Sequence, residues 1–189
     1  AHYHGQIWNA SEIARSLGIS QPSARHYLDT LESVFMMRQL QPWFAKLMKR
    51  QVKSPKIYFR DSGILHQLLG IESETDLQMH PKVGASWEGY AIEEAIKVMM
   101  PDEVYFWATH SGAELDLLMI KGGKKWGLEC KRVDAPRLTR SMQTALEDLQ
   151  LDHLTVIYPG TKRYPLSDKI TVVPLLELTR DEPAQQLFS

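Results

Sequence analysis

The chain has 189 residues, 43% of them hydrophobic, and a formal net charge of −1 at pH 7. This length and hydrophobic content suffice for two small cores or one large core, and we expect two small cores. Its single cysteine excludes an internal disulfide and a cysteine-rich zinc site. The sequence shows neither a charged segment followed by an apolar signal run nor an apolar run of roughly 18 residues, so we expect a soluble, cytoplasmic protein without a membrane partner. Residues 1–60 contain nine Lys/Arg and three Asp/Glu, a net +6, whereas residues 61–189 contain thirteen and twenty, a net −7; a basic first part favours binding to a phosphate backbone.

Residues 1–70 predict a winged helix-turn-helix. Residues 9–20 are typical of a short capped helix that Gly18 closes, and Ser20 with Pro22 begins a second helix. Strands are expected over residues 36–40 and 56–60, with a basic wing between them.

The start of the second helix is where this motif meets the major groove, and a wing contacts phosphates. The expected DNA-binding residues are therefore Ser20, Gln21, Ser23, Arg25 and His26 on the helix, and Lys46, Lys49, Arg50, Lys53 and Lys56 on and beside the wing. The alternative for this region is a protein-docking or structural module with a solvated basic hairpin.

The second part of the chain predicts an α/β domain with a central mixed sheet. A short apolar helix over residues 63–69 precedes an acidic linker, which we place at residues 71–83, and the second domain then covers residues 84–189. Its expected elements are a helix over 84–100, strands over 104–109, 113–120 and 124–131, a helix over 136–149, and strands over 154–158 and 170–173.

Acidic residues and a lysine recur on two neighbouring predicted strands. Regular alternation places Asp116 with Glu114 on one face and Leu115 on the other, and it places Glu129 with Lys131 on one face of the next strand. If the two strands pair, Asp116, Glu129 and Lys131 converge at one end of the sheet. The alternative is a solvated strand face with a chance salt bridge, and Glu114 fits an outer position better than a ligand position.

Glu88 lies on the inward stripe of the preceding helix, where a carboxylate needs a partner. With Asp116 and Glu129 it would complete a set of hard oxygen ligands of the kind that Mg²⁺ or Mn²⁺ prefers, and Lys131 would orient water and offset phosphate charge. The expected metal ligands are thus Glu88, Asp116 and Glu129, and the expected catalytic residues are these three with Lys131.

These residues resemble the signature of the PD-(D/E)xK nuclease superfamily: Glu88, residues 112–116 (Gly-Ala-Glu-Leu-Asp) and residues 129–131 (Glu-Cys-Lys). The resemblance implies a restriction-endonuclease-like fold, with Asp116 and Glu129 as metal ligands, Lys131 as the catalytic lysine and Glu88 as the helix acid.

Nearly the whole chain also resembles the C-terminal region of prokaryotic AAA-type ATPases that end in a DUF4143-like domain of unknown function. The matching stretches are residues 9–17, 27–31, 49–50, 53–65, 87–88 and 112–116. This resemblance implies an upstream ATPase domain as a partner. The chain itself has no Gly-x-x-x-x-Gly-Lys-Ser/Thr motif, so no ATP site of that kind is expected in it.

The expected function is metal-dependent hydrolysis of phosphodiester bonds in DNA. A catalytically silent DNA- or protein-binding regulatory module of the ATPase is the alternative, and a sequence-reading transcription regulator is a third reading. We leave a homo-oligomer open.

Overall fold

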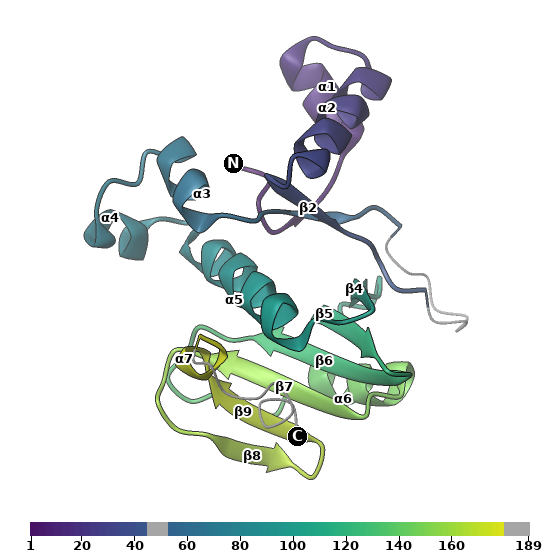
Figure 1. Ribbon diagram of the computed structural model, residues 1–189, viewed down its shortest axis with the longest axis vertical. Coiled ribbons are helices and arrows are strands. Elements are labelled where there is room, and N and C mark those ends of the chain that lie inside the picture. Colours follow the sequence, from purple (N-terminus) through teal and green to yellow (C-terminus); the bar gives the residue numbers. More distant parts are fainter. Residues whose placement is uncertain (45–52, 180–189) are drawn as a thin grey trace. The chain divides into compact units, whose positions relative to one another are not determined.

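The computed structural model describes residues 1–44 and 53–179 (Figure 1). Two compact units divide the chain: the first comprises residues 1–40 and 54–89, and the second comprises the described residues of 41–53 and 90–189. The predicted wing residues Lys46, Lys49 and Arg50 lie outside the described residues. Among the helices that are described, none is long and apolar enough to cross a membrane.

The first unit combines short helices with a three-stranded antiparallel sheet in the order β1-β3-β2. Its elements in chain order are β1 (Gln6–Ile7), α1 (Ala10–Leu17), α2 (Gln21–Ser33), β2 (Met37–Leu40), β3 (Lys56–Phe59), α3 (Ser62–Leu68), α4 (Glu74–Met79) and the first part of α5 (Val83–Met99). The predicted strands over 36–40 and 56–60 are confirmed, with each end shifted by at most one residue.

Local capping explains where these helices begin and end. The Asn9 side chain accepts hydrogen bonds from the backbone N–H groups of Ser11 and Glu12 at the start of α1, and Gly18 ends that helix in the left-handed conformation at φ 65°. The Ser20 side chain caps α2 by accepting from the N–H of Ser23. Ser73 begins α4 in the same way, so residues 74–79, which we expected in a linker, form a helix.

The second unit is built on a six-stranded mixed sheet in the order β4-β5-β6-β7-β9-β8, as the prediction of a mixed α/β sheet requires. Its elements are the rest of α5, then β4 (Glu103–Ala108), β5 (Glu114–Lys121), β6 (Lys124–Cys130), α6 (Arg140–Leu149), β7 (His153–Tyr158), β8 (Tyr164–Ser167), β9 (Ile170–Pro174) and α7 (Leu175–Leu178). The β6–β7 and β7–β9 pairs are parallel and the other pairs are antiparallel.

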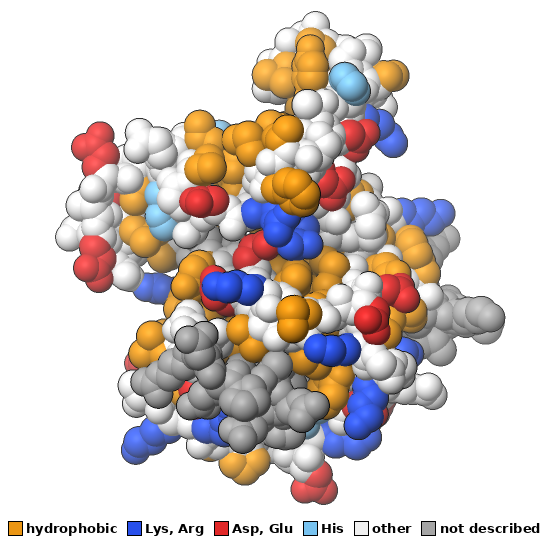
Figure 2. All heavy atoms as spheres, in the orientation of Figure 1, with side chains coloured by type: hydrophobic (Ala, Val, Ile, Leu, Met, Phe, Trp, Pro, Cys, Tyr) orange, Lys and Arg blue, Asp and Glu red, His pale blue; other side chains and the backbone are white. Residues whose placement is uncertain are grey.

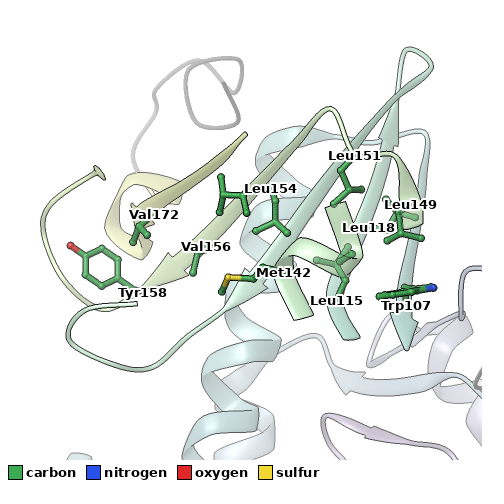
Figure 3. Packing of buried hydrophobic residues seen from close by; sticks show 12 residues of the cluster. Trp107, Leu115, Leu118, Met142, Leu149, Leu151, Leu154, Val156, Tyr158 and Val172 are labelled. Atoms are coloured by element: carbon green, nitrogen blue, oxygen red, sulfur yellow. The ribbon is translucent and has the colours of Figure 1, made fainter. Parts of the chain in front are cut away.

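Helix α6 covers one face of this sheet, and its apolar side chains meet those of the strands in a buried cluster (Figure 3). Met142, Ala145 and Leu149 come from the helix, while β5, β7 and β9 contribute most of the remaining members. The helix begins at Arg140, four residues after the predicted start at Pro136, because the Thr139 side chain accepts a hydrogen bond from the N–H of Met142 and acts as the N-cap.

Strand β5 contains one extra residue relative to β4. Between the pair Tyr105–Leu118 and the pair Trp107–Leu115, β4 advances by two residues and β5 by three. As a result Leu115 and Leu118, three residues apart, both lie in the cluster under α6 (Figure 3). The regular alternation that we expected for this strand is therefore wrong, since a β-bulge adds a residue and redirects the side chains beside it.

Candidate active site

Asp116 and Glu129 are two buried carboxylates on adjacent strands, with exposed fractions of 6% and 2%. The register of β5 and β6 pairs Leu117 with Leu128, so one position further along the strands Asp116 stands opposite Glu129. The Asp116 Oδ2 atom accepts a hydrogen bond of 2.8 Å from the backbone N–H of Cys130. The structure thus brings together the two strand carboxylates that the sequence singled out.

The two oxygens of Glu129 have different surroundings. Oε1 lies 2.5 Å from Nζ of Lys131, whereas Oε2 is buried and has no hydrogen-bond partner within the described part of the chain. Burial raises the pKa of the Glu129 carboxyl to about 8, the charge of Asp116 adds to the increase, and Lys131 opposes it. A buried carboxylate oxygen without a partner is costly, so a cation or a proton at this atom would stabilise the site.

Lys131 is the cation of this cluster, and its side chain is 35% exposed. Burial by itself would lower the pKa of Lys131, but the carboxylates of Glu129, Asp116 and Glu114 outweigh it and raise the pKa above the ordinary value. The lysine therefore remains charged, and the cluster of Asp116, Glu129 and Lys131 keeps an excess of negative charge when both acids are ionised.

Two adjacent carboxylates with an unpartnered oxygen fit a divalent cation such as Mg²⁺, which is commonly held by one or two carboxylates and completes its shell with water and phosphate oxygens. Across residues 1–44 and 53–179, no group of three His, Cys, Asp or Glu side chains is arranged to hold a metal ion. Any cation at Asp116 and Glu129 would thus take its remaining ligands from water or substrate.

Glu88 belongs to the first unit, where it has partners on β3. Its Oε1 atom accepts a hydrogen bond of 2.5 Å from the Tyr58 hydroxyl and lies 3.5 Å from Nζ of Lys56. Lys56, which we expected to contact phosphates, is only 8% exposed. The sequence analysis expected that the inward carboxylate of Glu88 needs partners. The partners that the structure shows are side chains of β3.

A buried histidine adjoins this group. Nδ1 of His4 accepts a hydrogen bond of 2.9 Å from the N–H of Phe59, and Nε2 lies 3.0 Å from the carbonyl oxygen of Ala85, to which it donates. Burial lowers the pKa of His4 to about 4, so the ring is neutral near pH 7. His4 thereby ties the N-terminal segment to β3 and to the start of α5.

Gly89→Ala is expected to destabilise the first unit by about 1–3 kcal/mol. A Cβ atom at Gly89 would lie 2.5 Å from Nε2 and 2.7 Å from Cε1 of His4, whose ring is fixed by two hydrogen bonds. Thermal denaturation followed by circular dichroism measures the loss. Gly84→Ala, in the same helix, is the matched control because a Cβ there meets no atom within 4 Å. Equal melting temperatures for the two variants would contradict this packing.

The residues predicted to meet DNA are partly accessible. Gln21, Arg25 and His26 are exposed on α2, and Lys53 is exposed as well. Ser20 and Ser23 bond to each other at 2.8 Å in the N-cap. On the face that Figure 2 shows, the coloured Lys and Arg side chains are interspersed with acidic and apolar ones and do not merge into one continuous patch.

Sequence reasoning missed Ser141. Its Oγ atom accepts from the N–H of Glu114 at 2.9 Å and lies 3.0 Å from the Glu114 carbonyl oxygen, to which it donates. This double contact fixes the start of β5, two residues before Asp116, against α6. An isolated serine 27 positions away in sequence gives no signal of such a contact, and the predicted start of the helix was displaced.

Comparisons with known proteins find two families of domains. Residues 83–178 match the profile described as a domain of unknown function (DUF4143), and residues 1–75 match another described as a domain of unknown function (DUF8612). Two mycobacterial proteins are each 50% identical over all 189 residues: the uncharacterized protein Rv2008c of Mycobacterium tuberculosis and the uncharacterized protein Mb2031c of Mycobacterium bovis. The chain spans 43% of the length of each. No solved structure matches the chain.

Proposed function

Since the chain belongs to the family of the domain of unknown function DUF4143, whose matched residues 83–178 include the buried carboxylate pair, we propose that its second unit hydrolyses phosphodiester bonds of DNA with Mg²⁺ or Mn²⁺. The observation that carries the proposal is the unpartnered Oε2 atom of Glu129, buried opposite Asp116 and two residues from Lys131. A buried carboxylate oxygen without a partner destabilises the folded protein, and a bound cation would remove that destabilisation.

In this proposal Asp116 and Glu129 hold the cation through carboxylate oxygens. The bound cation would supply Lewis-acid activation of water and neutralisation of phosphate charge. Lys131, charged and half-buried beside Glu129, binds a non-bridging phosphate oxygen or the attacking water and stabilises the negative charge that develops.

The order of elements supports a restriction-endonuclease-like assignment for the second unit. A helix, three strands, a further helix and a strand follow one another, and β4, β5, β6 and β7 are neighbours in the sheet. In the first unit, two capped helices and a small antiparallel sheet support the winged-helix assignment. We propose that Gln21, Arg25, His26 and Lys53 contact duplex DNA, and that an AAA-type ATPase domain, as the resemblance implies, controls the full protein.

One observation favours the alternative of a catalytically silent regulatory module. Lys131 forms an ion pair with Glu129, and such a pair neutralises part of the charge that would attract a cation. The nuclease proposal is preferred because the ion pair uses only Oε1 and leaves Oε2 without a partner within the described part of the chain.

Cleavage of plasmid and oligonucleotide DNA with Mg²⁺ or Mn²⁺, and with EDTA in place of the metal, tests the proposal. A double variant, Asp116→Asn with Glu129→Gln, purified in parallel, controls for contaminating nucleases. Asp168→Asn, an exposed acid in the turn between β8 and β9, controls for the loss of a charge. Metal-dependent cutting by the wild type and by Asp168→Asn, but not by the double variant, is expected. Binding of DNA without any cutting by the wild type would favour the silent module.

A further inference from the structure

A polar pocket of about 420 Å³ lies in the second unit between the β4–β5 turn and the first turns of α6. It is lined by Ser111, Gly112, Ala113, Arg140, Ser141 and Thr144. Its volume falls within the range of about 300–1,000 Å³ that small-ligand sites occupy. The side-chain donors that it offers to an anion are the Arg140 guanidinium and the hydroxyl groups of Ser111 and Thr144, a set that suits an anion with several oxygens, because the Ser141 hydroxyl already donates to the Glu114 carbonyl oxygen.

Hydrogen bonds hold both walls of this pocket in place. The Ser141 hydroxyl bonds to the N–H and the carbonyl oxygen of Glu114, which fixes α6 against the start of β5. The buried Thr109 hydroxyl lies 2.9 Å from the Ser111 hydroxyl and accepts a hydrogen bond of 3.1 Å from the N–H of Ala113. The pocket is therefore formed before any ligand arrives, which reduces the entropy cost of binding.

Arg140 has no acidic partner within residues 1–44 and 53–179. It ends a basic segment, since residues 131–140 contain four Lys/Arg and one Asp, although residues 61–189 as a whole carry a net charge of −7. An exposed arginine with unused donors beside the hydroxyl groups of Ser111 and Thr144 binds a phosphate group better than a single-oxygen ligand, because its planar guanidinium presents paired N–H groups.

The pocket is connected to the carboxylate pair through one short segment of strand. Glu114, which Ser141 holds, precedes Asp116 by two residues in β5, a separation of roughly 7 Å along a strand. We propose that this pocket binds a phosphate group of the DNA strand, one or two nucleotides from the bond cleaved at Asp116 and Glu129. The inference rests on the proposed function and adds Arg140 as the residue that positions the strand.

Titration of the isotope-labelled full chain with a single-stranded DNA oligonucleotide of about six nucleotides, followed by amide NMR in EDTA and again with Ca²⁺, tests this inference. The short probe limits the contribution of the first unit. We expect shifts at the amides of Gly112, Ala113 and Thr144, and about tenfold weaker binding by Arg140→Ala. Lys169→Ala, which removes an exposed cation from the β8–β9 turn, should change the affinity less than about twofold.

An absence of shifts at these amides, or equal affinities for wild type and Arg140→Ala in both buffers, overturns the inference. Inorganic phosphate and an RNA oligonucleotide of the same sequence are titrated in parallel. Tighter binding of phosphate than of DNA overturns the assignment of the pocket to a nucleic-acid strand. Tighter binding of RNA than of DNA overturns the assignment of that strand to DNA. If Arg140→Ala weakens DNA binding while the wild type cuts no DNA, the pocket stands and the catalytic proposal fails. If the wild type cuts DNA and Arg140→Ala leaves the KM for DNA unchanged, the catalytic proposal stands and the phosphate-binding role of the pocket fails.

Discussion

Lys131→Ala is expected to lower the rate of metal-dependent DNA cleavage by about a thousandfold, comparable to the loss of a donor that stabilises transition-state charge. The lysine ammonium lies 2.5 Å from Glu129 and is held charged by the surrounding carboxylates. Its removal leaves the developing negative charge on the phosphate without that donor. Lys124→Ala, at the other end of the same strand, is the matched control and should cut DNA at the wild-type rate.

Metal binding separates this role from a structural one. Because Lys131 competes with a cation for Glu129, Lys131→Ala should bind Mn²⁺ at least as tightly as the wild type in calorimetric titration. Melting temperatures of the two metal-free proteins show whether the variant is folded. Loss of both Mn²⁺ binding and cleavage in a folded Lys131→Ala protein would show that the lysine shapes the metal site and does not act in the chemical step.

Glu129→Gln is expected to stabilise the metal-free protein at pH 8 and above, by on the order of 2 kcal/mol, and to change its stability little near pH 4.5. Burial and Asp116 raise the pKa of Glu129 from 4.5 to about 8. Between these values the folded chain keeps a proton that the unfolded chain releases. The stability that the protonated carboxyl provides is therefore complete below pH 4.5 and is lost as the pH rises through about 8, whereas glutamine stays neutral throughout.

Thermal melts of wild type and Glu129→Gln across pH 4.5–9 measure this difference, which should grow with pH. Saturating Mn²⁺ should reverse the order, because a cation that binds only the folded wild type stabilises it. A difference between the two proteins that is independent of pH would show that the Glu129 carboxyl has an ordinary pKa. An equal effect of Mn²⁺ on both would remove Glu129 from the metal site.

Local patterns were enough to predict most of the helices and strands. The caps at Asn9, Gly18 and Ser20 determine two helices through contacts within a few residues, and turn glycines separate β5 from β6. Strands β1 and β8 and helices α4 and α7 were missed. Strand β8 alternates only half-buried and exposed side chains, and α4 has no buried residue, so neither has a strong apolar period.

The candidate site was predicted in part. Asp116, Glu129 and Lys131 are near one another because strand pairing brings together residues whose spacing the sequence displays. The partners that the structure shows for Glu88 could not be predicted from the sequence, because Tyr58 is 30 positions away and no neighbouring residue marks it as a hydrogen-bond donor to Glu88. The sequence likewise could not place Ser141 and Arg140 beside the start of β5, because their positions depend on where α6 begins.

Because of the extra residue in β5, the position of the Asp116 side chain depends on the number of residues in the strand as well as on the residue type at position 116. Deleting Leu117 or Leu118 would return β5 to an unbroken ladder with β4 and turn Asp116 and the side chains before it to the opposite face. Asp116 would then leave Glu129 although no carboxylate had been altered. Alignments that insert a gap in this strand therefore move a ligand, and relatives that carry all the acids but lack the additional residue should be counted as having lost the site.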